Sequence, residues 1–332
     1  MSDILVELKD VVKHFPVKRG FFERHAAHVH AVNGVSLRIR KGETLGLVGE
    51  SGCGKSTLGL LLLRLLKLDS GQIFFEGEEI THLPESKMRP LRRQIQVVFQ
   101  DPYASLNPRM KVSALLEEPL IIHRVGNKKE RLDRVDELLS LVGLSSDAKE
   151  KYPHEFSGGQ RQRVCIARAL ALKPKLIIAD EPVSALDVSI RGQIVNLLME
   201  LQEKLGLSLL LISHDLTVVQ HMSHRIAVMY LGKMMELFPS DQMSMVRHPY
   251  TQALISAIPI PEPGAKKKRL VLAGDVPSPI SPPSGCPFHP RCPYAEHQCK
   301  VNVPALLLKN RETLAACHLY DTIPLLKMGG EV

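Results

Sequence analysis

A glycine-rich turn between an apolar run and a helical pattern is the feature that most constrains the fold. The apolar run is Thr44–Val48, and the turn with the start of the helix is Gly49–Thr57. Its spacing is G-x-x-x-x-G-K-S in the order strand, loop, helix. Glycines let successive backbone N–H groups point inward at phosphate oxygens, and the positive end of the helix dipole adds to the attraction. The turn therefore predicts a phosphate-binding loop in an α/β fold.

The residues of this loop are candidate ligands of a nucleotide. Lys55 is expected to reach the β- and γ-phosphates, and Ser56 is expected to bind Mg²⁺. The alternative, a glycine-rich turn that binds nothing, is disfavoured by the strand–loop–helix context. The candidate ATP ligands in the loop are Gly49, Ser51, Gly52, Cys53, Gly54, Lys55, Ser56 and Thr57.

A second apolar run, Leu176–Ala179, ends in two carboxylates, Asp180 and Glu181. A carboxylate at this position can hold Mg²⁺ directly or through water, and we assign that role to Asp180. Glu181 is placed to polarise the attacking water as a general base. A carboxylate pair at the end of a strand is common by itself. Together with the phosphate loop, it predicts hydrolysis of a nucleoside triphosphate.

Strand-like and helix-like patterns alternate from residue 1 to about 240. Apolar runs at 44–48, 176–179 and 207–212 fit strands that are buried on both faces of a mainly parallel sheet. Helical patterns cover 55–67, 160–172 and 189–205. Segments 5–8 and 32–39 alternate in hydropathy, which predicts antiparallel strands, and 225–237 predicts a hairpin around Gly232.

The composition is that of an ordinary globular protein, with 44% hydrophobic and 23% charged residues. No window supplies the roughly 18 consecutive apolar residues that span a bilayer. The N-terminus has no basic segment of a secretory signal, so we expect a cytosolic chain. The net charge of +8 is compatible with nucleic acid, an anionic membrane surface or bound phosphates as the partner, and it does not choose among them.

Four further motifs follow in a fixed order. They are Gln100 after an apolar run, the run Ser157-Gly158-Gly159-Gln160, the run Ser184-Ala-Leu-Asp187, and His214 after a strand-like run. With the phosphate loop and the two carboxylates, they resemble the motifs of ATP-binding cassette (ABC) ATPases. The resemblance implies that Gln100 contacts Mg²⁺ and water, and that His214 is a catalytic residue that contacts the γ-phosphate.

Two aromatic residues complete the comparison with that family. Phe15 resembles the side chain that stacks on adenine. Phe156 stands where the family usually has a leucine before the S-G-G-Q run. This departure falls at a position that does not contact the nucleotide.

The same resemblance implies the fold class and the assembly. The fold is expected to be α/β, an ABC-type P-loop NTPase with a RecA-like core, an antiparallel β subdomain and a helical subdomain at about 101–165. We assign this cassette to residues 1–240. In the family, two cassettes hold two ATP molecules between the phosphate loop of one and the S-G-G-Q run of the other. A partner cassette is therefore required, and contacts in trans are assigned to Ser157, Gly158, Gly159, Gln160 and Asp187.

Residues 241–332 resemble the C-terminal extension of one branch of the family, the oligopeptide and dipeptide importer ATPases. The segments that carry this resemblance are 248–257, 274–280 and 100–109 together with the terminal cysteines. The chain is most similar to the second, F-type ATPase subunit of such importers. The partners implied are a second ABC ATPase in a heterodimer, two membrane permeases and an extracytoplasmic solute-binding protein. The implied location is peripheral, on the cytoplasmic face of the inner membrane.

Six cysteines in a cytosolic chain do not predict disulfides. Four of them cluster near the C-terminus: Cys286, Cys292, Cys299 and Cys317. Four thiolates suffice for a tetrahedral Zn²⁺ site or a [4Fe–4S] cluster. The spacing lacks the C-x2-C pairs of zinc ribbons, and the family resemblance points to an iron–sulfur cluster. Zinc and unliganded thiols stay open as alternatives.

Two other functions compete with ATP-driven peptide import. The same ATPase could serve nickel or another small solute, because members of this branch also do so. A non-transport ABC ATPase acting on nucleic acid or ribosomes is disfavoured, because residues 55–157 leave no room for a long coiled coil and the cassette is not duplicated. The basic run 266–269 lies in a Pro-rich stretch without interleaved aromatic residues, so we interpret it as a solvated linker and expect no nucleic-acid partner.

Overall fold

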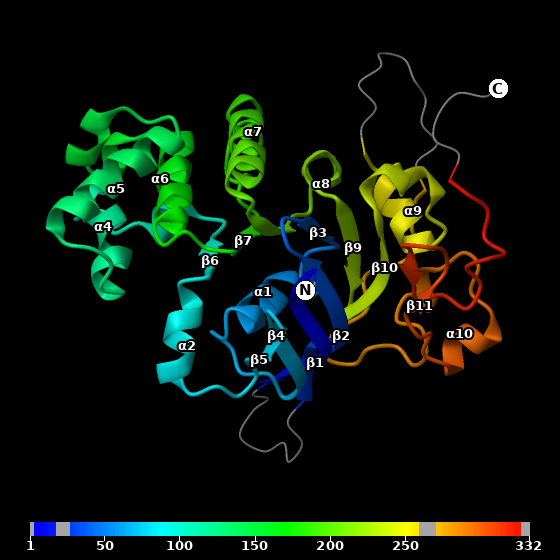
Figure 1. Ribbon diagram of the computed structural model, residues 1–332. Helices are drawn as coiled ribbons and strands as arrows, with labels where there is room; N and C mark the ends of the chain where they lie inside the picture. Colours follow the sequence, from blue (N-terminus) through cyan, green and yellow to red (C-terminus); the bar gives the residue numbers. More distant parts are fainter. Residues whose placement is uncertain (1–2, 18–26, 259–269, 327–332) are drawn as a thin grey trace. The chain divides into compact units, whose positions relative to one another are not determined.

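The structure is a computed structural model that describes residues 3–17, 27–258 and 270–326 (Figure 1). Contacts divide the chain into two compact units. The first unit comprises Met1–Leu5, Ile39–Thr44 and Glu76–Ser213. The second comprises Val6–Arg38, Leu45–Phe75 and His214–Val332. The basic run 266–269 lies outside the described residues.

In the first unit, three buried strands form a parallel sheet. Their order is β6 (Ile95–Val98), β7 (Leu176–Asp180) and β8 (Ser208–Ile212). Almost every residue of β7 and β8 is buried, as continuous apolar runs require when both faces of a sheet are covered. The strands predicted at 176–179 and 207–212 are thus present with ends that differ by one residue.

The remainder of the first unit is largely helical. The helices are α2 (Glu85–Arg92), α3 (Pro102–Ser105), α4 (Val112–Ile122), α5 (Lys128–Leu141), α6 (Gly158–Leu170) and α7 (Val188–Leu205), with a short strand β5 (Glu78–Glu79) before them. Helices α4, α5 and α6 pack against one another, as the green part of Figure 1 shows. Their contact surface is formed by buried apolar side chains such as Leu116, Val135 and Leu139. Asn127 closes the start of α5 with a capping box.

In the second unit, β2 (Ala27–Arg40), β1 (Ile4–Val17) and β4 (Ser70–Phe75) lie side by side. Strand β1 pairs antiparallel with β4, with Val6 opposite Phe75 and Leu8 opposite Ile73. Side chains of β2 alternate between buried and exposed in its second half, which matches the alternation at 32–39. The antiparallel strands predicted for the first forty residues are therefore present.

The second unit also contains β3 (Thr44–Val48) beside β9 (Arg225–Tyr230), in parallel register. Strand β9 turns back into β10 (Lys233–Pro239) through Leu231 and Gly232, which have positive φ of 43° and 76°. Such a pair suits the tight turn of a hairpin, which confirms the hairpin predicted around Gly232. Helices α1 (Lys55–Leu62) and α8 (Leu216–Met222) follow β3 and His214–Asp215, respectively.

The C-terminal residues are joined to this sheet. Strand β12 (Leu314–Ala315) pairs antiparallel with β10 and with β11 (Leu307–Leu308). Two helices, α9 (Pro249–Ser256) and α10 (His297–Val301), belong to the same part of the chain and are yellow and orange in Figure 1. Short 3-10 helices in the described part of the chain lie in connecting segments, at 146–150, 153–155, 240–245 and 289–291. The expected boundary between the cassette, 1–240, and the extension, 241–332, therefore falls inside the second unit.

Helix α1 is shorter than the predicted helix at 55–67. It ends at Leu62, and Arg64 takes a positive φ of 55°. The N–H groups of Leu65 and Leu66 both donate to the carbonyl of Leu60, which closes the helix end. Hydropathy alone could not place this end, because the apolar residues continue beyond it.

Candidate functional site

The phosphate loop leaves β3 and enters α1 in the second unit through three glycines of positive φ. These values are 153° at Gly49, 78° at Gly52 and 106° at Gly54. A Cβ atom at Gly49 would lie 2.1 Å from the carbonyl oxygen of Met229, and one at Gly54 would lie 2.0 Å from that of Ala31. The backbone therefore requires glycine at both ends of the motif for space as well as for conformation.

Lys55 is buried and turns back onto its own loop. Its Nζ donates to the carbonyl oxygen of Gly49 at 2.7 Å and to that of Glu50 at 3.0 Å. A buried ammonium is stable only when its N–H groups have acceptors, and these carbonyls supply them. The single positive charge of the loop is thus held at the centre of the turn.

The other loop residues differ in exposure. Ser51, Gly52 and Ser56 are exposed, whereas Cys53 is buried and its carbonyl accepts a bond of 3.0 Å from the N–H of Gly232. Burial raises the pKa of the Cys53 thiol. Cys53 therefore contributes to packing of the loop against the β9–β10 hairpin.

The first unit brings Gln100 and Glu181 together. The side-chain Nε2 of Gln100 donates to Oε2 of Glu181 at 3.0 Å. Glu181 follows β7 with a positive φ of 47°, and its N–H donates to the carbonyl of Ile212 at the end of β8. Strained backbone of this kind is concentrated at functional sites in proteins. Asp180 is the last residue of β7 and directly precedes this turn.

The S-G-G-Q run begins helix α6. Ser157 and Gln160 form a capping box, in which the serine Oγ accepts from the Gln160 N–H at 3.3 Å and the glutamine Oε1 accepts from the Ser157 N–H at 3.0 Å. Both residues are exposed, while Gly159 is buried. A Cβ at Gly159 would lie 2.4 Å from Cγ2 of Ile190 in α7, so glycine allows the two helices to approach.

The remaining predicted residues lie at element ends or on a strand. Asp187 is the N-cap residue of α7 in the first unit. His214 is exposed and precedes Asp215, the N-cap residue of α8, in the second unit. Phe15 is half-buried on β1, with Nζ of Lys13 5.5 Å from its ring centroid. Phe156, the departure from the family pattern, is buried.

All six cysteines lie in the described part of the chain and are free thiols. Four of them form what we call the four-thiol cluster: Cys286, Cys292, Cys299 and Cys317. Burial, with a smaller contribution from the charges of the other three cysteines, raises the pKa of Cys317 to about 12. Burial likewise raises the pKa of Cys286 to about 11. The four side chains are therefore close enough to interact electrostatically.

The positions of these thiols give no direct support to a metal site. Across residues 3–17, 27–258 and 270–326, no group of three or more His, Cys, Asp or Glu side chains has an arrangement that could hold a metal ion. The backbone of the cluster is nevertheless connected, since the N–H of Cys286 donates to the carbonyl of Cys299 at 2.8 Å.

Three residues that were not predicted to belong to the site lie beside the phosphate loop: Arg291 and Tyr250 contact Glu50 of the loop, and Tyr230 contacts both of them. Arg291 lies 2.9 and 3.1 Å from the two carboxylate oxygens of Glu50. The Tyr250 hydroxyl accepts a bond of 2.9 Å from the Glu50 N–H, and the Tyr230 ring lies tilted at 57° against the Tyr250 ring. Of these three residues, only Tyr250 lies in a segment that carries the family resemblance, 248–257. Hydropathy gives no indication that Arg291 contacts Glu50, because the two residues are 241 positions apart.

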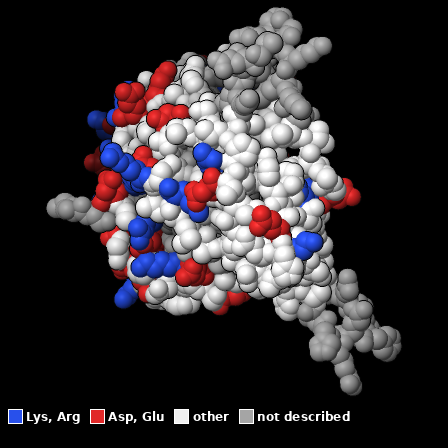
Figure 2. All heavy atoms as spheres, turned by 90° about the vertical axis from the view of Figure 1, so that its right-hand side faces the viewer, with Lys and Arg blue, Asp and Glu red and all other residues white. Residues whose placement is uncertain are grey.

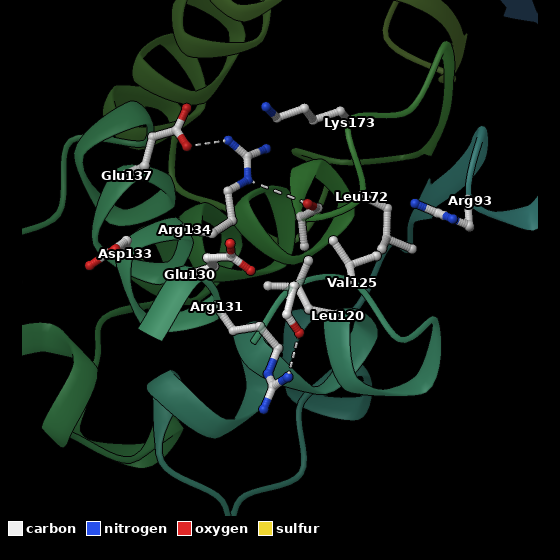
Figure 3. A pocket seen from close by; sticks show the side chains of 12 residues that line it. Arg93, Leu120, Val125, Glu130, Arg131, Asp133, Arg134, Glu137, Leu172 and Lys173 are labelled. Atoms are coloured by element: carbon white, nitrogen blue, oxygen red, sulfur yellow. Dashed lines mark hydrogen bonds and ion pairs between the residues drawn. The ribbon is translucent and has the colours of Figure 1, made fainter. Parts of the chain in front are cut away.

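A separate pocket of about 510 Å³ lies in the first unit among the ends of α4, α5 and α6 (Figure 3). It has apolar lining from Leu120, Val125 and Leu172 and a rim of mixed charge. Arg134 on this rim is held by Glu137 and by the carbonyl of Leu170. None of the predicted site residues lines the pocket, so it is no part of the candidate nucleotide site.

Charge on the face shown in Figure 2 is mixed. Basic and acidic side chains alternate on it, and wide areas carry neither. This face offers no extended basic patch of the kind that binds a nucleic-acid backbone. Among the described residues, no helix is both long enough and apolar enough to cross a bilayer.

Comparison with known proteins identifies the class first. The family model described as "ABC transporter" matches residues 32–184. A solved dimeric ATP-binding cassette, MJ0796 in a post-hydrolysis state with ADP and Pi, is 32% identical with a TM-score of 0.63 and covers 71% of this chain and 99% of its own. CbiO1 from Clostridium perfringens, part of the ABC transporter complex cbiONQ, is 29% identical with a TM-score of 0.63, covering 73% and 90%. The chain is an ABC-type ATPase, which confirms the predicted fold class.

The branch of the class follows from the C-terminal part and from curated relatives. The model "Oligopeptide/dipeptide transporter, C-terminal region" matches residues 235–299. The oligopeptide transport ATP-binding protein AppF of Bacillus subtilis is 53% identical over 324 residues, covering 96% of this chain and 98% of the relative. The dipeptide transport ATP-binding protein DppF of Haemophilus influenzae is 49% identical over 311 residues, covering 93% and 94%. The chain belongs to the family of oligopeptide and dipeptide transport ATP-binding proteins.

Proposed function

We propose that this chain hydrolyses ATP to power import of dipeptides or oligopeptides across the cytoplasmic membrane. The observation that carries the proposal is the double match, with the cassette at 32–184 and the peptide-transporter region at 235–299 in one chain. The cassette accounts for ATP hydrolysis. The C-terminal region separates this branch from ABC ATPases in general. We assign the cassette to residues 1–240 and the extension to 241–332.

The phosphate loop is assigned to binding of the triphosphate. Its backbone N–H groups and the Lys55 ammonium supply positive charge, and Mg²⁺ is assigned to Ser56, Asp180 and Gln100. When bound, Mg²⁺ neutralises charge on the phosphate oxygens. Phe15 is assigned to stacking on adenine. The support for these roles is the glycine geometry of the loop and the family to which the chain belongs.

Glu181 is assigned as the general base and His214 as a second catalytic residue at the γ-phosphate. A carboxylate that accepts a bond from an amide keeps a defined orientation, and Gln100 donates such a bond to Glu181 at 3.0 Å. The carboxylate can then accept a proton from the attacking water through its other oxygen. The amide of Gln100 would thus position the base as well as contact the metal.

The exposed start of α6 is assigned to a second nucleotide, held by another cassette. Ser157, Gly158, Gly159, Gln160 and Asp187 would contact it in trans. Ser157 and Gln160 are exposed at the positive end of α6, which supports binding of an anion supplied by a partner. The partner cassette is proposed to be a different chain, in a complex with two permeases and an extracytoplasmic solute-binding protein. The complex would place this chain peripherally on the cytoplasmic face of the inner membrane.

Glu181→Gln tests the assignment of the base. The amide preserves size and the contact with Gln100 but cannot take the proton of water, so turnover is expected to fall about 100-fold or more while ATP binding is retained. Steady-state hydrolysis and nucleotide binding are measured on the purified chain. Glu203→Gln, on the exposed surface of α7, is the matched control and is expected to hydrolyse ATP like the wild type. Hydrolysis at the wild-type rate in Glu181→Gln would contradict the assignment.

The cargo is tested by uptake in a strain that lacks this chain. We expect loss of dipeptide or oligopeptide uptake, restored by the wild type and not by Glu181→Gln. Loss of nickel uptake with peptide uptake intact would favour the alternative solute. Co-purification with nucleic acid in place of hydrophobic permease chains would favour the non-transport alternative.

For the four-thiol cluster we propose a [4Fe–4S] centre, with Zn²⁺ as the alternative. The proposal rests on the chemistry of the donors, because four free thiols in a part of the chain with little regular structure are the ligands that such a centre requires. The group would fix a proline-rich segment that has too few apolar residues for a core of its own. Its ligands would be Cys286, Cys292, Cys299 and Cys317.

Cys317→Ser and Cys165→Ser form a matched pair for this proposal. After anaerobic purification the wild type is expected to be brown, with absorbance near about 400 nm that is lost in Cys317→Ser. Cys165, which is buried on α6, should tolerate serine without loss of colour. A colourless wild type with stoichiometric zinc would replace the iron–sulfur assignment, and a wild type with neither metal would end both.

A further inference from the structure

Glu50 places a negative charge in the loop that is proposed to bind a triphosphate. It stands between Gly49 and Ser51, and its own carbonyl accepts a bond of 3.0 Å from Lys55. A carboxylate beside a polyanion raises the free energy of the bound state unless another charge cancels it. The structure supplies that charge from the C-terminal extension.

Arg291 pairs with Glu50 through both carboxylate oxygens. Its Nη1 lies 2.9 and 3.1 Å from them, and 9% of the arginine side chain and 26% of the glutamate side chain are exposed. Because the arginine is largely removed from water, solvent and salt screen the pair less than a surface ion pair.

Aromatic side chains hold both partners in place. The Tyr250 hydroxyl accepts from the Glu50 N–H at 2.9 Å, and the Tyr230 hydroxyl accepts from Arg291 at 3.4 Å. The rings of Tyr230 and Tyr250 have centroids 4.7 Å apart, and Phe288 lies 5.4 and 5.3 Å from them. The edge-to-face and tilted contacts define the position of each hydroxyl.

The backbone around Arg291 belongs to the four-thiol cluster. Arg291 ends the 3-10 helix His289–Arg291, which lies between Cys286 and Cys292. The His289 N–H donates to the carbonyl of Cys286 at 3.0 Å, and the Cys292 N–H donates to that of His289 at 3.3 Å. The position of Arg291 therefore depends on the positions of Cys286 and Cys292, the two cysteines on either side of it.

We propose that Arg291 is a positioning residue of the phosphate loop, through which the C-terminal extension sets the affinity for ATP. It cancels the charge of Glu50 and fixes the position of that carboxylate through two short contacts. The inference rests on the proposed function of the loop. It gives a role in nucleotide binding to the same extension that identifies the peptide-transporter branch of the family.

The test measures the Kd for Mg·ATP on the purified full-length chain. Arg291→Met retains an unbranched apolar side chain and removes the charge, so we expect the Kd to rise about fivefold to tenfold. Glu50→Gln alone is expected to bind within about twofold of the wild type, because it removes the charge that needs cancelling. The double variant Arg291→Met with Glu50→Gln is expected to regain near wild-type affinity.

Rescue by the second substitution separates charge cancellation from a merely structural role. The double variant removes both charges of the pair, so it is expected to fold even if Arg291→Met alone does not. Its Kd can then still be compared with that of the wild type. Arg131→Met is the matched control, because Arg131 forms a half-buried pair with Glu117 on the first unit and should not alter the Kd. The proposal is overturned if Arg291→Met binds like the wild type, or if the double variant binds weakly. Failure of the wild type itself to bind Mg·ATP would instead overturn the proposed function together with this inference.

Discussion

Gly54 and Gly52 of the phosphate loop offer a matched pair of glycine-to-alanine substitutions. Both have positive φ, 106° at Gly54 and 78° at Gly52. They differ in their surroundings, since a Cβ at Gly54 would lie 2.0 Å from the carbonyl oxygen of Ala31 and 2.9 Å from the Met229 side chain. A Cβ at Gly52 would have no atom of the described residues within 4 Å.

The structure separates two contributions to the loss of stability. Positive φ costs an alanine about 1–2 kcal/mol at either position. At Gly54 the added methyl group also meets a backbone oxygen, which cannot rotate away, and overpacking of this kind costs about 1–3 kcal/mol more. We therefore expect Gly54→Ala to destabilise the chain by about 2–5 kcal/mol and Gly52→Ala by about 1–2 kcal/mol.

Urea unfolding of the unliganded chain measures both values. The chain has 0 Trp, so far-ultraviolet circular dichroism replaces tryptophan fluorescence as the probe. The difference between the two variants is the informative quantity, because strain from positive φ is common to both. Equal unfolding midpoints for Gly54→Ala and Gly52→Ala would refute the steric reasoning, and a wild-type midpoint for both would refute the backbone assignment of the loop.

Two further predictions concern stability and local order. Burial raises the pKa of Glu236 to about 7, above its ordinary value of 4.5, so its contribution to stability is complete below about pH 4.5 and is lost as the pH rises through 7. Glu236→Gln should therefore gain about 2 kcal/mol relative to the wild type between pH 5 and pH 8, measured by urea unfolding at both values, and parallel pH profiles would contradict this. Ser157→Ala removes the cap of α6, which costs about 1 kcal/mol locally. Amide hydrogen exchange at Gln160 should accelerate, and unchanged protection would show that the cap does not hold the helix start.

The local parts of the site could be predicted because their chemistry lies in contiguous residues. Glycine spacing, an apolar strand and a helix start define the phosphate loop without knowledge of anything distant. The same reasoning extended α1 to residue 67, while the structure ends it at Leu62. Apolar residues continue past that point, and the left-handed turn at Arg64 has no signature in hydropathy.

Contacts between distant polar residues could not be predicted. Gln100 and Glu181 are 81 positions apart, and each was assigned a role toward a ligand with no indication that they bond to each other. A hydrogen bond between two side chains leaves no periodic pattern in sequence, since either residue alone is compatible with solvent. The motifs therefore predict a role for each residue, and the structure adds the hydrogen bond between them.

The burial of Arg291 is the clearest case of a feature that the sequence alone does not predict. A charged residue between Pro290 and Cys292 in a proline-rich stretch would ordinarily be assigned to solvent, yet only 9% of its side chain is exposed. Burying a guanidinium is unfavourable unless an acid pairs with it, and Glu50, 241 positions earlier, is that acid. An extension that served only to stabilise itself would have no need of this pair. Its presence connects the four-thiol cluster to the loop that is proposed to bind ATP, so a change in the cluster is expected to alter the affinity of that loop for the nucleotide.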